Sequence, residues 1–119
     1  MSESIFEQLG GFPTVRKVVM EFYHNVLDHD ELAGYFMNTK MERLIDHQTK
    51  FVSYLLNGPA SYTDDYLRKI HARMNITDIH FDMIKEVLSD AFEHFDVDDD
   101  IIELVATEFE NRRSLVVTA

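Results

Sequence analysis

The sequence predicts a single all-α domain that spans residues 1–119. Only two prolines and four glycines interrupt the 119 residues. Between them, the apolar residues recur at helical spacing rather than in the alternation that strands require. A chain of this length with 45% hydrophobic residues can also bury one core of its own. We therefore expect five or six helices and one long internal loop.

The N-terminal part predicts two helices with a glycine stop between them. A short helix from Ile5 to about Leu9 ends at Gly10 and Gly11, because glycine allows the backbone angles of a helix end. Pro13 suits the first turn of the next helix. The apolar stripe of that helix comprises Val15, Val18, Val19, Phe22, Tyr23, Val26 and Leu27. The segment DHDELAG that follows is predicted to be a turn.

The middle of the chain, KMERLIDHQTKFVSYLLNG, predicts a helix with an unusual face. The residues that share this face are Leu44, His47, Gln48, Phe51 and Leu55. We expect this face to be buried and the helix to stop at residues 57–59. Because an unpaired buried amide or imidazole costs about 1–3 kcal/mol, His47 and Gln48 require partners there.

The C-terminal half predicts a loop followed by three helices. PASYTDD is expected to be the loop, and a short helix follows from about Asp65 to Met74. One face of that helix carries Leu67, Ile70, His71 and Met74. Thr77 or Asp78 is expected to cap the next helix. Its inward residues are Phe81, Ile84, Leu88 and Phe92, and those of the last helix, which begins after residues 98–100, are Ile101, Ile102, Val105 and Phe109.

The composition excludes several classes of protein. A formal net charge of −11 argues against partners such as nucleic acid or an anionic membrane surface. No stretch is apolar for long enough to act as a signal peptide or to span a bilayer, so we expect a cytoplasmic protein. The absence of cysteine excludes disulfides and covalent haem attachment through C-x-x-C-H.

Two of the six histidines, His47 and His71, lie on apolar helix faces. For either one alone, a core histidine with satisfied hydrogen bonds is the simpler interpretation. Together with Gln48 and Tyr23, they indicate a shared buried polar site. Zinc fits this site poorly, because the chain has no H-E-x-x-H motif and no carboxylate on the same faces. Haem b fits better, because it combines a flat macrocycle with an iron that takes an axial histidine and a pocket tuned by hydrogen-bond donors.

Five motifs in register resemble the group 1 truncated haemoglobins over nearly the whole chain. IFEQLGG resembles their N-terminal helix and double glycine, EFYHNVL their second helix, and YF the aromatic pair before the distal helix. RLIDHQTKFVSYLLNG resembles the distal helix and YLRKIHARMNITDIHF the proximal segment. The resemblance implies a truncated two-over-two globin sandwich, with a short proximal helix after a long loop. Asn57-Gly58 departs from the family's second Gly-Gly.

The same matching implies roles for individual residues. His71 would be the proximal iron ligand, and Tyr23 and Gln48 the distal pair that donates hydrogen bonds to bound oxygen, with Leu44 beside them. In many members the position of His47 holds a lysine or arginine that reaches a haem propionate, whereas in some a histidine there binds iron as a sixth ligand. The residues expected to contact the haem are Phe36, Leu44, His47, Gln48, Phe51, Leu67, His71, Phe81 and Leu88.

The function implied by the resemblance is reversible binding of oxygen, nitric oxide and carbon monoxide at haem iron. The alternative is an enzyme, either a nitric oxide dioxygenase or a peroxidase-like protein. Because the sequence contains no flavin or nicotinamide domain, such turnover would depend on a separate reductase. A third interpretation is a haem-free helical interaction domain, in which the four polar residues of the site would satisfy one another.

Overall fold

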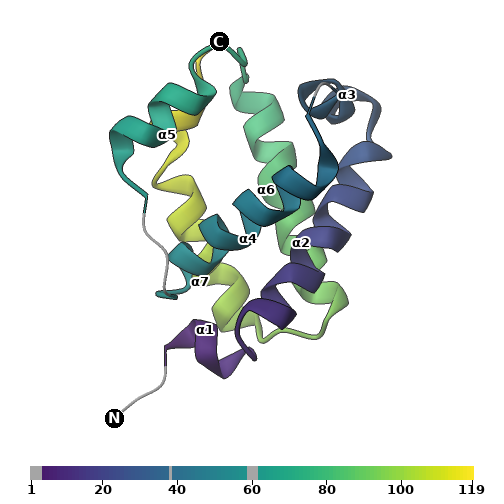
Figure 1. Cartoon of the computed structure of the whole chain (residues 1–119), viewed down its shortest axis with the longest axis vertical. Coiled ribbons are helices and arrows are strands. Elements are labelled where there is room, and N and C mark those ends of the chain that lie inside the picture. Colours follow the sequence, from purple (N-terminus) through teal and green to yellow (C-terminus); the bar gives the residue numbers. More distant parts are fainter. Residues whose placement is uncertain (1–3, 38, 59–61) are drawn as a thin grey trace.

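The computed structural model describes residues 4–37, 39–58 and 62–119. Every regular element in these ranges is a helix (Figure 1), which confirms the predicted fold class. The order is α1 (Ile5–Gln8), α2 (Phe12–Leu27), α3 (Asp30–Ala33), the 3-10 turn η1 (Gly34–Phe36), α4 (Met41–Leu55), α5 (Asp64–His71), α6 (Asp78–His94), α7 (Asp99–Glu110) and α8 (Arg113–Val116). Within the described ranges, no helix is long and apolar enough to cross a membrane.

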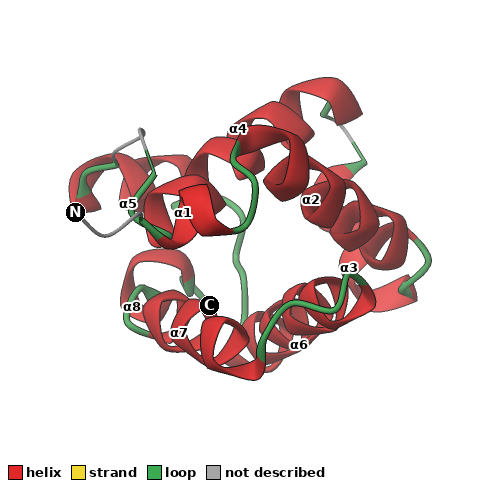
Figure 2. Cartoon of the chain, turned by 90° about the horizontal axis from the view of Figure 1, so that it is seen from below, coloured by secondary structure: helices red, strands yellow, loops and turns green. Residues whose placement is uncertain are grey.

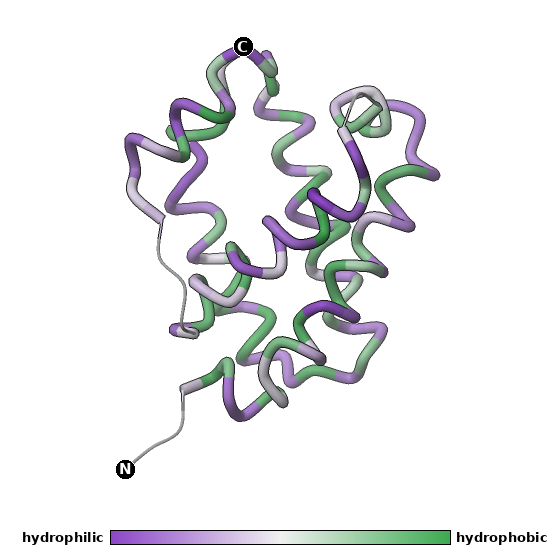
Figure 3. The backbone as a smooth tube through the Cα atoms, viewed as in Figure 1, coloured by the Kyte–Doolittle hydropathy of each residue, from purple (hydrophilic) through white to green (hydrophobic). Residues whose placement is uncertain are grey.

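The four longest helices form two layers. Figure 2 shows α2 and α4 in one layer and α6 and α7 in the other. Helix α2 packs against both α4 and α6, and α6 packs against α7. Apolar and hydrophilic positions alternate along these helices (Figure 3), as expected when one face of each is turned toward a shared interior.

The core lies where α2, α4 and α6 meet. Its fully buried side chains include Val15, Val18, Val19, Val26, Val52, Ala91 and Phe92. Burial of one such valine, leucine or phenylalanine stabilises the fold by about 1.5–3 kcal/mol. The predicted stripe of α2 is thus confirmed except at Leu27, which is 44% exposed because it is the last residue of the helix and the chain turns away there.

The predicted helix ends are largely confirmed. Gly10 and Gly11 have φ of 108° and 73°, which side chains other than glycine rarely adopt. Thr77 caps α6, because its hydroxyl accepts a hydrogen bond from the backbone N–H of His80 at 3.1 Å. Asn57 ends α4 in the left-handed region, with φ of 63°.

The prediction of a turn at DHDELAG was wrong. Asp30–Ala33 forms helix α3, with two acidic residues in its first turn and Leu32 fully buried. Negative charge stabilises a helix N-terminus, and the buried side chain of Leu32 packs this helix against the core. Part of the predicted loop, residues 59–61, lies outside the described residues.

The chain from α5 onward differs from the prediction in two ways. Helix α5 ends at His71 rather than at Met74, and Asn75 then adopts a left-handed φ of 54°. The short helix α8 was not predicted. Arg113 ties it to α6 through Asp78 at 3.0 Å and through Asp82. Its guanidinium also lies 4.5 Å from the centre of the Phe81 ring.

Candidate functional site

Helix α4 packs on the core through a different face from the one that its apolar spacing predicts. The residues buried on this face are Ile45, Thr49, Val52 and Ser53. The Thr49 hydroxyl donates to the carbonyl of Ile45, and the Ser53 hydroxyl to that of Thr49, each at 2.6 Å. Because these hydroxyls are satisfied inside their own helix, a face that looks polar in the sequence can be buried. On the face predicted to be buried, only Leu55 is buried, and His47 is exposed.

The face of α4 that was predicted to be buried borders a cavity instead. The free space between its lining side chains is about 770 Å³, and part of this space is open solvent rather than enclosed cavity. Of the residues predicted to contact haem, those that line it are Phe36, His47, Gln48, Phe51, Leu67, His71 and Phe81. Leu44 and Leu88 do not line it: Leu44 is half-buried against the core, and Leu88 is part of the core.

Nine further residues line the cavity but were not predicted to belong to the site. They are Phe22, Tyr62, Ile70, Met74, Ile76, Ile84, Phe109, Arg112 and Val116. Ile70 and Met74 share the predicted helix face of His71, so helical spacing could have found them. No comparable signal marks Tyr62 or Val116, since the first lies in a loop and the second in the unpredicted helix α8.

His71 has the hydrogen bonding of a metal ligand. It is the last residue of α5, and its Nδ1 lies 2.7 Å from the carbonyl oxygen of Leu67. A carbonyl only accepts hydrogen bonds, so Nδ1 carries the proton and Nε2 keeps a free lone pair. Burial lowers the pKa of His71, although the bond to Leu67 opposes this in part. The ring is therefore neutral, and the lone pair of its Nε2 can bind a metal.

Tyr23 supplies an unpaired hydroxyl close to the cavity. The side chain is 1% exposed, and its hydroxyl has no hydrogen-bond partner among the described residues. Its ring packs edge-on against Phe22 and Phe36, which line the cavity, with centroids 5.0 and 5.5 Å away. Burial raises the pKa of Tyr23, and the nearby Gln48 amide lowers it only in part, without a hydrogen bond of normal geometry between the two.

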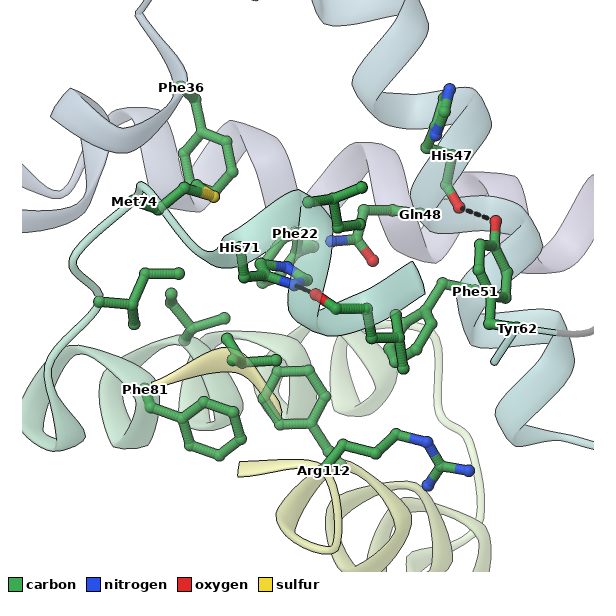
Figure 4. A pocket seen from close by; sticks show the side chains of 16 residues that line it. Phe22, Phe36, His47, Gln48, Phe51, Tyr62, His71, Met74, Phe81 and Arg112 are labelled. Carbon is green, nitrogen blue, oxygen red and sulfur yellow. Dashed lines mark hydrogen bonds between the residues drawn. The ribbon is translucent and has the colours of Figure 1, made fainter. Parts of the chain in front are cut away.

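His71, Gln48 and His47 lie at different depths of the cavity. Figure 4 shows His71 and Gln48 among the side chains that line the cavity, whereas the ring of His47 points away from His71. The backbone carbonyl of His47 accepts a hydrogen bond from the Tyr62 hydroxyl at 3.3 Å. His47 thus stands at the rim, with an exposed side chain.

These residues fit a haem group. A mostly apolar cavity suits the macrocycle, and a neutral histidine with a free Nε2 suits the iron. An unsatisfied buried hydroxyl costs about 1–3 kcal/mol, and a ligand bound in the cavity could offset that cost by accepting a hydrogen bond from Tyr23.

Comparison with known proteins agrees with this geometry. Residues 4–117 match the family described as Bacterial-like globin. A group 1 truncated haemoglobin of Tetrahymena thermophila is 36% identical over 110 residues, which cover 92% of this chain and 91% of that protein.

Solved structures of truncated haemoglobins have the same fold. The truncated haemoglobin of Tetrahymena pyriformis, in its Fe(III) form, superposes with a TM-score of 0.87 at 32% identity and covers 97% of this chain and 98% of that one. The 2/2 haemoglobin of Synechococcus sp. PCC 7002, solved in the cyanomet state with covalently attached haem, gives a TM-score of 0.88 at 30% identity, with 98% and 100% covered. The chain therefore belongs to the bacterial-like globin family, as a group 1 truncated haemoglobin with a two-over-two fold, and this membership implies a haem cofactor.

Proposed function

We propose that this chain binds haem b through His71 and reversibly binds oxygen, nitric oxide and carbon monoxide. The observation that carries the proposal is the pairing of two groups: a neutral histidine with a free Nε2 at the cavity, and a buried tyrosine hydroxyl without a partner. When bound, the haem supplies an iron at which a diatomic gas can bind. The protein would supply the groups that hold the haem and that donate hydrogen bonds to the gas.

On the proximal side, the hydrogen bond from His71 Nδ1 to Leu67 has two effects. It selects the tautomer in which Nε2 is free, and it fixes the direction in which the ring points. Such an outer hydrogen bond also makes the ligating nitrogen more basic.

On the distal side, Tyr23 and Gln48 would donate hydrogen bonds to the bound gas. Because the Tyr23 hydroxyl is buried, a bond that it donates is stronger than the same bond in water. It is also a weak acid whose pKa is raised by burial, so it keeps its proton at neutral pH. Both features favour slow release of oxygen.

The apolar wall would exclude water and contact the macrocycle through Phe36, Phe51, Leu67 and Phe81. His47, exposed at the rim, is suited to a haem propionate, and its use as a sixth iron ligand would require the side chain to turn inward. Leu44 and Leu88 would act from behind the wall, by supporting the residues that touch the haem.

The test is the visible spectrum of haem-loaded protein in its ferrous, gas-free form. One broad high-spin band is expected, with His71 alone on the iron. Sharp low-spin bands that disappear in the His47→Ala variant would instead make His47 the sixth ligand, and carbon monoxide would then bind faster to that variant. Failure to bind haem would overturn the proposal.

A second candidate function is peroxidase-like or nitric oxide dioxygenase turnover with a separate reductase. A set of tyrosines between the cavity and the surface favours the peroxidase form of this alternative.

A further inference from the structure

A chain of aromatic rings leads from the cavity to the surface. Phe51 and Tyr62 line the cavity (Figure 4), and their ring centroids are 5.7 Å apart. The ring of Tyr66 follows at 5.7 Å from Tyr62 and is 40% exposed. Tyr54 branches from the same cluster, 5.9 Å from Tyr62. These separations are those of packed aromatic pairs, so the rings form a continuous series from the cavity to the surface.

The tyrosine hydroxyls of the two branches differ in their hydrogen bonding. Arg112 donates a hydrogen bond to the Tyr54 hydroxyl at 3.0 Å, and its guanidinium lies 5.0 Å from the centre of that ring. The guanidinium is also paired with the Glu108 carboxylate at 3.0 Å, so little net charge acts on Tyr54. Its hydrogen bond to the phenol oxygen nevertheless opposes the removal of an electron from Tyr54.

The Tyr62 hydroxyl instead donates to a neutral carbonyl. Burial raises the pKa of Tyr62, and the phenol of Tyr66 and the Asp46 carboxylate add to the shift. Asp46 is itself paired with Lys50 at 3.3 Å, so little net charge acts on Tyr62. The hydrogen bond that its hydroxyl donates still favours the loss of an electron together with the phenolic proton.

We propose that Tyr62 and Tyr66 form a one-electron relay between the haem cavity and the surface, through which the chain oxidises small phenols at the expense of hydrogen peroxide. This inference rests on the proposed binding of haem. Tyr66, the exposed end of the path, lies on helix α5 five residues before His71, the predicted iron ligand. Tyr54 is the branch that the relay does not use.

The electrons and protons balance as follows. With haem bound, the reduction of one hydrogen peroxide to two molecules of water would consume two electrons and two protons. Tyr62 gives up one electron at a time, and its phenolic proton passes to water at the cavity mouth. An electron from Tyr66 and a proton from solvent restore Tyr62. The phenoxyl radical on Tyr66, whose proton has entered solvent, takes a hydrogen atom from an external phenol, so two phenols are oxidised for each peroxide.

The experiment is rapid freezing of ferric, haem-loaded protein after addition of hydrogen peroxide, with detection of radicals by electron paramagnetic resonance. The wild type is expected to give a tyrosyl radical and, without a phenol, dimers cross-linked through tyrosine. Tyr66→Phe should keep the radical on Tyr62 and lose the cross-linked dimers. Tyr62→Phe should lose both the dimers and the radical.

Two matched variants control for the loss of a tyrosine hydroxyl. Tyr54→Phe lies in the same cluster, and Tyr35→Phe lies outside it, with its hydroxyl 2.6 Å from Nδ1 of His80. Both should give the wild-type radical and the wild-type dimers. Loss of the signal in Tyr54→Phe would overturn the proposed path.

The outcomes separate this inference from the proposed function. A normal haem spectrum with a radical that survives in the Tyr62→Phe/Tyr66→Phe double variant would overturn the relay alone. A protein that binds no haem would overturn both. Because the radical signal and the cross-linked peptides are read directly, the result does not depend on turnover.

Discussion

The two ends of this globin domain are stabilised in different ways. Around α2, α4 and α6, valines such as Val15 and Val19 and the ring of Phe92 are fully buried against other protein side chains. At the cavity end, α5 buries only Leu67 among its eight residues, and Ile70 is 46% exposed. In the first region, protein side chains fill the space around one another. The second presents apolar surface to a cavity, near the unpaired hydroxyl of Tyr23, and we expect a ligand to complete it.

The largest expected effect is on the protein-packed end. Phe92→Ala should lower the free energy of unfolding of the haem-free protein by about 3–5 kcal/mol, because it leaves a hole in a packed core. Phe51→Ala removes the same atoms from the cavity wall, where a space already exists, and should cost clearly less. Urea denaturation of both variants checks this. Equal losses of unfolding free energy in the two variants would contradict this difference between the two ends.

The next effect concerns the cavity end in the presence of haem. His71→Ala should weaken haem binding by more than about 100-fold, since even outer-shell partners of a metal ligand are worth 10–100-fold. Haem titration followed in the visible spectrum measures the change. His24→Ala is the matched control, because His24 is exposed on α2, away from the cavity lining, and lies 3.9 Å from Asp28. A similar loss in that control would remove the special role of His71.

A smaller effect is expected on the distal side. Tyr23→Phe should speed oxygen dissociation by about tenfold, equivalent to about 1.4 kcal/mol for one lost hydrogen bond. Stopped-flow displacement of oxygen measures it. The haem-free variant should be no less stable than the wild type, since the hydroxyl has no partner within the described part of the protein. An unchanged dissociation rate would exclude Tyr23 as a donor.

The smallest effect is a dependence of stability on pH. The pKa of His71 is lowered by burial from the ordinary value of 6.5. As the pH falls through that value, the unfolded chain takes up a proton before the folded one, so stability decreases and then levels off below the folded-state pKa. In haem-free protein, His71→Gln should therefore lose less stability than the wild type between about pH 7.5 and about pH 5.5. Identical losses in urea melts would contradict this.

The sequence predicts those parts of the fold that depend on helical periodicity and on residues that end helices. The stripe of α2 and the glycine stop before it were predictable because those signals are local. Helix α3 was missed because its single buried residue, Leu32, gives no periodicity. Helix α8 was missed because Arg113 fixes it through ion pairs with α6 that are distant in sequence.

The site was predictable where helical spacing or the resemblance marked a residue. His71, Gln48 and Phe51 line one cavity, although they come from two helices. The burial of α4 was misjudged, because Thr49 and Ser53 satisfy their hydroxyls within the helix. Tyr62 carries no periodic signal, and only the three-dimensional structure brings it to the cavity.

The small buried area of α5 also has a consequence for the order of events in folding. Segments with few buried contacts open most easily and close last, because little free energy holds them. The core of α2, α4 and α6 can therefore form without waiting for the cofactor. We therefore expect haem to bind to a protein whose core has already formed, and its supply to affect mainly the ordering of α5.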